Sequence, residues 1–306
     1  MKKQKIVIGS RGSKLALIYA NKAKSAILEY SDIEKTEIEI KEIVTKGDQV
    51  QDKRLSEVGG KGLFSKNIEN ELLNEEIDIA IHALKDMPAN ENIDLYTNSF
   101  LSRNDPREIL ISNDNLKLDE LKKNAIIGTS SFRREFQIKR LNNDILCKLI
   151  RGNVDTRLKK LKEGLYDAII LSLAGVKSLE LEKEITQIFL INEVIPSAGQ
   201  GVICAQCKEN NFEIIEILNK VNDPDTFKCA VAERDVLKIL EGDCETAVGA
   251  NAELKDNKIT LEAELFSLDG SKRFYEKITM EISDFDKIGL EIGKRLKKKS
   301  NGNYKK

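Results

Sequence analysis

The sequence is poor in the residues that build metal sites and disulfides. Among 306 residues there is one histidine, His82, which excludes a histidine-rich metal site. The five cysteines are an odd number in a large chain, which argues against a disulfide framework. Cys204 and Cys207 have the spacing of a redox or zinc pair, but they lie in an apolar run typical of a buried strand, and no second pair exists. We interpret both as core residues and expect no metal.

Long apolar runs and a strong net charge are also missing. No apolar run reaches the roughly 18 residues of a membrane span. The formal net charge of −1 gives no general attraction to nucleic acid or to an anionic membrane. Residues 1–5 lack the apolar stretch of a signal peptide and run straight into an apolar strand. We therefore expect a soluble cytoplasmic protein without nucleic-acid or membrane partners.

Apolar residues are nevertheless plentiful, at 41% of a chain of 306 residues. This length exceeds what one hydrophobic core usually serves, so two or three domains are expected. Over the first two thirds, apolar strands alternate with amphipathic helices, which is typical of parallel-sheet α/β domains. Strands are expected at residues 5–9, 37–45, 77–84, 125–128, 146–150, 168–173 and 201–207, and helices at 13–30, 65–75, 132–141 and 154–163.

Two stretches of this pattern resemble each other. The strand and turn at residues 6–13 parallel those at 126–133, and the strand at 77–84 parallels that at 166–173. The same order in both predicts two similar domains facing across a cleft, as in periplasmic binding proteins. Beyond residue 223 the pattern changes to a smaller α+β domain. The predicted domains are residues 1–101 with 202–219, residues 107–195, and residues 224–306. We expect a solvated, frayed tail at residues 297–306.

Arginines gather in one region of a chain that otherwise uses lysine. The chain has 12 arginines against 38 lysines, and residues 133–157 hold five of the 12: Arg133, Arg134, Arg140, Arg151 and Arg157. The planar guanidinium binds a carboxylate or phosphate with two parallel hydrogen bonds, where lysine offers a point charge. A solvated helix face is the alternative, and it suits Arg140, which comes late in its helix. Arg133, Arg134 and Arg151 instead follow strands at helix starts.

Helix starts at the carboxyl ends of strands are where α/β proteins bind anions. Arg11 and Ser13 repeat this arrangement in the first domain, although residues 9–14 do not have the glycine spacing of a Walker loop. Phosphate remains possible on chemistry alone. The dispersed arginines fit several separate anionic groups better than a single phosphate. The ligand predicted from these residues is a small polyacidic molecule.

Six motifs stand in the order found in the porphobilinogen deaminase (hydroxymethylbilane synthase) family, which this chain resembles from about residue 5 to about residue 270. They are Val58-Gly-Gly-Lys-Gly-Leu-Phe64, His82-Ala-Leu-Lys-Asp-Met-Pro88, Gly128-Thr-Ser-Ser-Phe-Arg-Arg134, Arg151-Gly-Asn-Val-Asp-Thr-Arg157, Gly199-Gln-Gly201 and Glu241-Gly-Asp-Cys244. One block alone would be weak evidence. Six in order along the chain are very specific.

The resemblance implies a monomeric three-domain transferase. Such an enzyme condenses four porphobilinogen units head to tail, releases ammonia, and finally hydrolyses off the linear tetrapyrrole hydroxymethylbilane for haem and related pigments. It also implies a dipyrromethane cofactor, attached through a thioether to the cysteine that matches Cys244. Porphobilinogen carries an acetate and a propionate, which agrees with the arginine cluster.

The resemblance also assigns site residues. It implies that the cofactor is held by Cys244, Lys85, Asp86, Thr129, Ser131, Arg133 and Arg134. It implies that the incoming substrate is bound by Arg11, Ser13, Lys61, Arg151, Asn153, Arg157 and Gln200. Asp86 is the expected catalytic residue, because a carboxylate near pyrrole N–H groups can stabilise the cation left when ammonia departs. From the residues alone, an aspartate before Met-Pro would be interpreted as a turn residue.

Several positions depart from the family pattern. Glu57 and Ser178 stand where positive residues are frequent, Ala83 stands where serine is common, and Asp243 replaces a glycine beside Cys244. The first two substitutions put the affinity for acidic intermediates in doubt. Asp243 is expected to raise the pKa of the Cys244 thiol. The polar segment 46–57 is expected to be a mobile lid.

Two other classes of protein share parts of this pattern. A non-catalytic solute-binding module would keep the arginines and the cleft, but it has no use for Asp86, Cys244 or a third domain. The effector domain of a transcription regulator is disfavoured, because no basic helix-turn-helix precedes residue 5.

Overall fold

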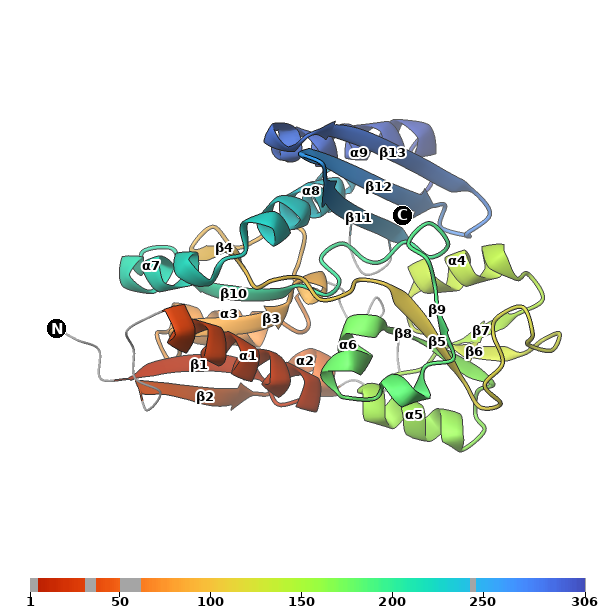
Figure 1. Cartoon of the computed structure of the whole chain (residues 1–306), viewed down its shortest axis with the longest axis horizontal. Coiled ribbons are helices and arrows are strands. Elements are labelled where there is room, and N and C mark those ends of the chain that lie inside the picture. Colours follow the sequence, from red (N-terminus) through yellow and green to blue (C-terminus); the bar gives the residue numbers. More distant parts are fainter. Residues whose placement is uncertain (1–4, 31–36, 50–61, 243–245, 306) are drawn as a thin grey trace.

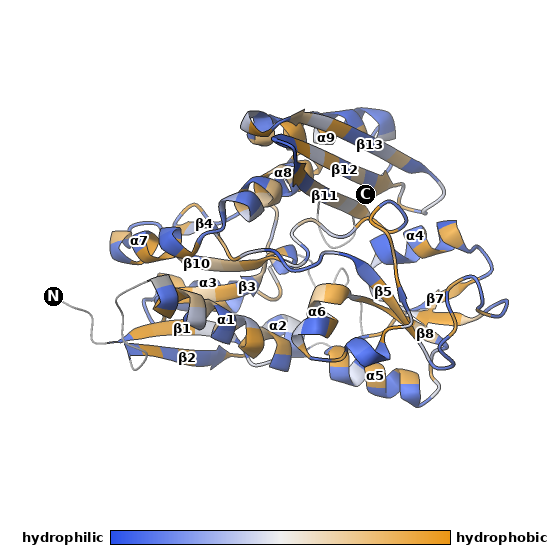
Figure 2. Cartoon of the chain, in the orientation of Figure 1, coloured by the Kyte–Doolittle hydropathy of each residue, from blue (hydrophilic) through white to orange (hydrophobic). Residues whose placement is uncertain are grey.

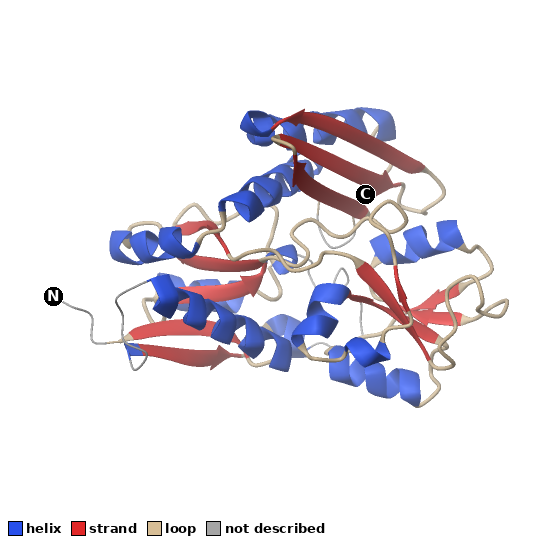
Figure 3. Cartoon of the chain, in the orientation of Figure 1, coloured by secondary structure: helices blue, strands red, loops and turns tan. Residues whose placement is uncertain are grey.

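The structure is a computed structural model that describes residues 5–30, 37–49, 62–242 and 246–305. Figure 1 shows two α/β domains side by side, with a third domain packed above them. Figure 3 shows that helices flank the sheets of the first two domains, whereas the third has its helices on one side of its sheet. The expected class, two similar α/β domains and a smaller α+β domain, is confirmed.

The first domain is a five-stranded sheet covered by helices on both faces. Its strand order is β2 (Ile38–Ile43), β1 (Ile6–Arg11), β3 (Ile79–Ala83), β10 (Ile203–Lys208) and β4 (Leu95–Phe100). Helices α1 (Lys14–Tyr30) and α7 (Phe212–Val221) pack on one face, and α3 (Lys66–Leu73) packs on the other. Both faces of the central strands are therefore buried, which explains their nearly continuous apolar sequences (Figure 2).

The second domain repeats this plan. Its sheet has the order β7 (Leu146–Lys148), β6 (Ile126–Gly128), β8 (Ala168–Ser172), β5 (Glu108–Ser112) and β9 (Gln187–Ile188). Helix α4 (Phe132–Leu141) covers one face, while α5 (Val154–Lys162) and α6 (Leu173–Ser178) cover the other. In each sheet, three parallel strands are followed by an antiparallel strand. The chain passes from the first domain to the second at residues 101–107 and returns at residues 189–202, and we call these segments the first and second crossovers. The antiparallel strand, β10 or β5, directly follows one of them. The sequence pattern predicted β10 but left β5 unassigned.

The third domain is an antiparallel sheet under two helices. Strands β11 (Val248–Lys255), β12 (Lys258–Phe266) and β13 (Arg273–Glu281) pair in sequence order. Helix α8 (Pro224–Leu240) begins where the Asp223 carboxylate accepts a 2.7 Å hydrogen bond from the amide of Thr226. Helix α9 (Phe285–Ser300) approaches α8 so closely that a Cβ at Gly289 would lie 2.1 Å from the carbonyl oxygen of Ala232.

The expected frayed tail is wrong. Residues 297–300 complete α9, whose Ile288, Ile292 and Leu296 are buried against the sheet. Tyr304 is 1% exposed, and its hydroxyl donates a 3.1 Å hydrogen bond to the carbonyl of Leu240. Lys297, Lys298 and Lys299 are exposed on the solvent side of α9, whose buried apolar residues recur every four residues.

One buried carboxylate ties the third domain to both crossovers. Glu233 of α8 is fully buried and pairs with Arg103 of the first crossover, with 2.6 and 3.2 Å between the nitrogens and oxygens. It also accepts 2.7 Å hydrogen bonds from the amide of Gly199 in the second crossover and from the amide of Ala252 in β11. Glu233 therefore joins α8 and β11 of the third domain to both segments that link the first two domains.

Replacing Glu233 with Gln is expected to lower the free energy of unfolding by about 3–5 kcal/mol, because it leaves the Arg103 guanidinium buried without its counter-charge. Urea denaturation followed by circular dichroism measures this. Glu241→Gln is the matched control, because Glu241 pairs with Lys297 and Lys305 at the surface and should unfold close to the wild type. Equal stability of the two variants would contradict the central role of Glu233.

Candidate functional site

A cleft of about 650 Å³ lies between the first two domains. Its walls are the carboxyl ends of β1 and β3 on one side, and the starts of α4, α5 and α6 on the other. The charged residues that line it are Arg11, Lys14, Glu42, Asp48, Lys85, Asp86, Arg134, Arg151, Asp155 and Arg157. Parallel strands end at the same edge of their sheet, so residues far apart in sequence meet here.

Arg11, the last residue of β1, is held from several sides. Its Nε lies 3.2 Å from each carboxylate oxygen of Asp48, and its guanidinium carbon lies 4.1 Å from the centre of the Phe64 ring. Thr45 donates a 2.6 Å hydrogen bond to Asp48. Burial would raise the pKa of Asp48, but hydrogen bonds from Arg11 and Thr45 outweigh it and lower that pKa. Arg11 also approaches Asp86, at 3.7 Å from Nη1 to Oδ2.

Four residues of the expected lid lie within the described part of the chain. Residues Lys46–Gln49 form the short helix α2, and its Asp48 is fixed by Arg11. Gly47 is buried against the Phe64 ring, where a Cβ would lie 2.3 Å from the ring carbon. This start of the segment is therefore packed, and residues 50–57 lie outside the described residues.

Lys85 and Asp86 end a single 3₁₀ turn, Leu84–Asp86, directly after β3. Lys85 Nζ donates a 3.2 Å hydrogen bond to the side-chain oxygen of Gln200, and Gln200 donates a 2.7 Å bond to the carbonyl of Pro106. Burial and the neighbouring Arg134 lower the pKa of Lys85 to about 8, against the opposing effect of Asp86. Gln200 thus orients a lysine that stays mainly protonated at neutral pH.

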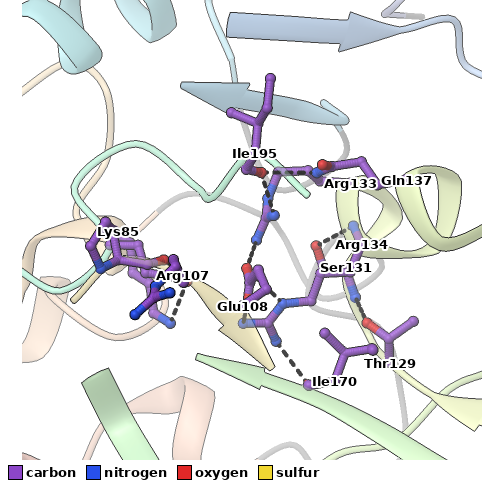
Figure 4. Close-up of polar contacts among 12 residues, drawn as sticks. Lys85, Arg107, Glu108, Thr129, Ser131, Arg133, Arg134, Gln137, Ile170 and Ile195 are labelled. Atoms are coloured by element: carbon purple, nitrogen blue, oxygen red, sulfur yellow. Dashed lines mark hydrogen bonds and ion pairs between the residues drawn. The ribbon is translucent and has the colours of Figure 1, made fainter. Parts of the chain in front are cut away.

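Glu108, the first residue of β5, holds two arginines at once. It is fully buried, and its carboxylate lies 2.6 Å from Nη2 of Arg133 and 2.8 Å from Nη2 of Arg134 (Figure 4). Arg134 also donates to the carbonyl of Ile170 at 3.2 Å, and Arg133 to that of Ile195 at 2.8 Å. Burial alone would raise the pKa of Glu108, but Arg134 and Arg133 lower it to about 2.

The two adjacent arginines therefore have different surroundings. Arg134 lines the cleft, whereas Arg133 extends from the cluster toward Ile195 in the second crossover (Figure 4). Both arginines are predicted from the sequence to hold the cofactor. Neighbouring residues of a helix point about 100° apart, which lets the two side chains contact different segments. Arg140 is exposed and donates to the carbonyl of Glu193 at 2.7 Å, as expected for a residue late in its helix.

Arg151, Asn153 and Arg157 gather at the start of α5, and all three line the cleft. Gly152 has φ of +110°, and a Cβ there would lie 2.7 Å from Thr156, so this close turn requires glycine. Arg157 Nε donates to the carbonyl of Gly152 at 2.8 Å. Burial, followed by the charges of Arg134 and Arg151, lowers the pKa of Arg157 to about 10.

The hydroxyl residues shape the same loops. Ser13 lines the cleft, and its Oγ accepts a 3.3 Å bond from the amide of Ala16. Ser131 caps α4 by accepting from the amide of Arg134 at 3.4 Å, and Thr129 accepts from the amide of Ser131 at 3.2 Å. Two predicted residues, Lys61 and Cys244, lie outside the described residues.

Sequence reasoning missed Asp48, Phe64 and Glu108 as site residues. Asp48 stands in a polar segment that resembled a loop, and Phe64 was quoted in a motif without a role. Glu108 follows Asp-Pro-Arg and gives no local signal of its partners. Only the contact between β5 and the start of α4 reveals that Glu108 forms ion pairs with two arginines.

The charge of the cleft suits a molecule with several carboxylates. Arg134, Arg151 and Arg157 are close enough for the first two to depress the pKa of the third, which means that the cations repel one another. A bound carboxylate would relieve this repulsion and gain charge-assisted hydrogen bonds. A dipyrromethane with its acid side chains fits this donor set. Among the described residues, no group of His, Cys, Asp and Glu side chains could hold a metal ion.

Comparison with known proteins decides the family. Residues 6–216 match the porphobilinogen deaminase, dipyrromethane cofactor binding domain, and residues 227–298 match the porphobilinogen deaminase C-terminal domain. This chain belongs to the porphobilinogen deaminase family. The family's cofactor-binding domain spans both domains that form the cleft. The family matches do not favour the alternative of a non-catalytic solute-binding module.

The relatives cover nearly the whole chain. The porphobilinogen deaminase of Bacillus cereus is 43% identical over 96% of this chain and 94% of its own length. Those of Staphylococcus epidermidis and Alkaliphilus metalliredigens are 41% and 38% identical, over 96% and 95% of this chain and 95% and 92% of theirs. A solved structure, the periplasmic VFT2 domain of Bordetella pertussis BvgS, has a TM-score of 0.44 at 11% identity, covering 72% of this chain and 87% of that one.

Glu108→Gln is expected to cost about 3–5 kcal/mol of stability near neutral pH, because it leaves two buried guanidiniums without a full counter-charge. The pKa of Glu108 is lowered in the folded state, so its contribution is complete above the unfolded pKa, about 4.5. It is then lost as the pH falls toward about 2. Urea denaturation from pH 7 to pH 3 measures the difference between wild type and variant. A difference that does not shrink at the acidic end would contradict this assignment.

Proposed function

We propose that this chain condenses four porphobilinogen units, with loss of ammonia, into a linear tetrapyrrole that is then released by hydrolysis. The observation that carries the proposal is the crowding of Arg134, Arg151 and Arg157 in a cleft that also holds Asp86. Each porphobilinogen unit brings two carboxylates, so a growing chain needs many cationic contacts. No described helix is long and apolar enough to cross a membrane.

The cofactor would be held where Lys85 of the first domain and Arg134 of the second lie near each other in the cleft. When bound, a dipyrromethane supplies the pyrrole ring to which new units are added. Lys85 and Arg134 are positioned by Gln200 and Glu108 and are available for its acid groups. Ser131 and Thr129 support the position of Arg134 by shaping the start of α4. Arg133 contributes indirectly to cofactor binding, because it pairs with Glu108, which also positions Arg134.

The incoming ring would be bound by the remaining cations. Arg11 approaches from the first domain, and Arg151 and Arg157 approach from the second. Ser13 and Asn153 stand at the helix starts beside them and offer hydrogen bonds to the same carboxylates. Lys61 is assigned to this group by the family motif. A substrate held from both domains is oriented before reaction, which lowers the entropic part of the barrier.

Asp86 is the proposed catalytic residue. Its carboxylate is about one third exposed at the cleft edge, beside Arg11. Loss of ammonia turns porphobilinogen into a cationic azafulvene, and a nearby carboxylate stabilises this cation and accepts hydrogen bonds from the pyrrole N–H. Asp86 also takes part in moving protons between the pyrrole units.

Ser178 stands where the family pattern has a frequent arginine. It lies at the end of α6, and Lys22 of α1 donates a 3.4 Å hydrogen bond to its hydroxyl. We propose that Lys22 partly replaces the missing positive charge. Thioether attachment at Cys244, a cytoplasmic location and a monomeric state remain predictions from the sequence.

Asp86→Asn is expected to keep the fold and to lower turnover of porphobilinogen by about 10²–10⁴-fold, because the amide cannot carry the counter-charge or accept a proton. Ammonia release and tetrapyrrole formation measure the rate, and thermal melting checks the fold. Asp119→Asn, at an exposed position of the second domain, is the control. Turnover of Asp86→Asn near that of the control would remove the role.

Intact-protein mass spectrometry is expected to find the wild-type protein heavier by two deaminated porphobilinogen units, and Cys244→Ser without this addition. Incubation with porphobilinogen then tests the activity, since a solute-binding module neither consumes it nor releases ammonia. Unmodified wild-type protein that still makes the tetrapyrrole would refute the covalent cofactor. Protein that leaves porphobilinogen unchanged would refute the activity.

A further inference from the structure

The loop that follows Asp86 is held by the third domain. Residues 87–94 connect the 3₁₀ turn Leu84–Asp86 to β4, and they form no helix or strand of their own. Such a segment lacks the regular hydrogen bonds of a sheet or helix, so its position depends on other groups that bind its backbone. Arg234 of α8 supplies several of these contacts.

Arg234 binds the loop through both its backbone and a side chain. Nη2 donates hydrogen bonds to the carbonyls of Pro88 and Ala89, at 2.7 and 3.5 Å. Nε and Nη2 lie 3.0 and 2.7 Å from Oε1 of Glu91. Arg234 is 3% exposed, and hydrogen bonds sheltered from water are stronger. A guanidinium suits this position because its rigid fork holds several acceptors at once. We call these four residues the Arg234 cluster.

The turn itself rests on the same helix. Leu84 and Met87 are buried, at 1% and 5% exposure, in an apolar cluster that includes Ala230 of α8. In a 3₁₀ turn, side chains three residues apart lie above one another, so Leu84 and Met87 point the same way. Lys85 and Asp86, the two residues between them, line the cleft instead. The direction of Asp86 is therefore set by how firmly its neighbours are held against α8.

Helix α8 makes these contacts from one face. Phe227, Ala230 and Arg234 are spaced by three and four residues, which places them side by side on a helix. The ring of Phe227 stacks on Phe100 of β4, with 6.1 Å between the ring centres. The helix thus supports the turn before the loop, the loop itself and the strand after it.

We propose that Arg234 is a positioning residue for Asp86. By holding residues 88–91, it fixes the direction in which the Asp86 carboxylate faces the cleft. The inference rests on the proposed function. Arg234 is not among the residues that line the cleft, so it acts through the loop and touches no substrate. A carboxylate that is held before the reaction stabilises a developing cation without having to reorient, which lowers the barrier.

Arg234→Met removes these hydrogen bonds and keeps a long side chain. The variant is expected to fold, because the side chain of Glu91 is 25% exposed and reaches water when its partner is lost. Its kcat on porphobilinogen should fall by about 10–100-fold with little change in KM, since a small displacement of a reacting group costs rate. An unreactive analogue with methyl in place of aminomethyl should bind the variant and the wild type equally in calorimetry.

A double-mutant cycle with Asp86→Asn tests whether Arg234 acts through Asp86. If it does, kcat of the double variant should lie within about threefold of kcat of Asp86→Asn alone, because the carboxylate to be positioned is already gone. If Arg234 serves only the stability of the fold, the two losses multiply. Ammonia release at high enzyme concentration measures the low rates. All variants are compared as holoenzyme, with the cofactor checked by intact mass.

Three further variants control the cycle. Arg234→Lys keeps the charge and should recover part of the lost kcat. Glu91→Gln weakens the same cluster from the loop side and should lower kcat by about threefold without changing the binding of the methyl analogue. Val236→Ala is the stability control, because Val236 lies on α8, is fully buried in the core of the third domain and is outside the Arg234 cluster. It should melt earlier but keep the wild-type kcat while folded.

The outcomes separate this inference from the proposed function. Wild-type kcat in folded Arg234→Met, or losses that multiply in the double variant, would overturn the positioning role and leave the function standing. An equal loss of kcat in Val236→Ala would also overturn it, since instability alone would then explain the effect. If Arg234→Met does not fold, the same cycle with Glu91→Gln decides. If the wild type does not consume porphobilinogen, the proposed function fails and the positioning role fails with it.

Discussion

The site depends on one buried carboxylate. Glu108 is fully buried at the start of β5 and pairs with two guanidiniums at the start of α4. A buried carboxylate is costly unless it is paired, and two adjacent arginines at a helix start would repel each other without it. The cluster therefore holds Arg134 toward the cleft and Arg133 toward the second crossover. The two arginines lower the pKa of Glu108 to about 2, so the ion pairs outweigh the cost of burying its carboxylate.

The topology places this cluster opposite the carboxyl ends of β1 and β3 in the first domain. Both sheets use the same strand order, and each takes its fourth strand from the far side of a crossover. The carboxyl ends of β1 and β3 therefore face the helix starts that follow β6 and β7. Glu233 fixes the two crossovers to the third domain through Arg103 and Gly199. The lining of the cleft is thus set by long-range contacts, and its cations come from both domains.

Local sequence predicted the elements that are buried on both faces. The strands at residues 6–11, 79–83 and 168–172 are runs of apolar residues, because helices cover both sides of their sheets. The pattern was less informative in two places. Strand β5 follows Asp-Pro-Arg and begins with a glutamate, which resembles a loop until its partners are known. In α9 the many lysines obscured the apolar stripe of Ile288, Ile292 and Leu296, a signal that could have been found.

The sequence by itself determined the α/β class, the repeated plan of the two domains and the choice of arginine where carboxylates are to be bound, because these depend on periodicity and residue type. Its motifs, taken in order, also identified the family. Only the tertiary structure decided which groups Arg133 and Arg134 contact, because both depend on a partner, Glu108, that no local pattern connects to them. It also brought Arg11 and Asp86 of the first domain to the same cleft as Arg134, Arg151 and Arg157 of the second. Long-range packing brings such groups together, and the periodicity of a single segment carries no record of it.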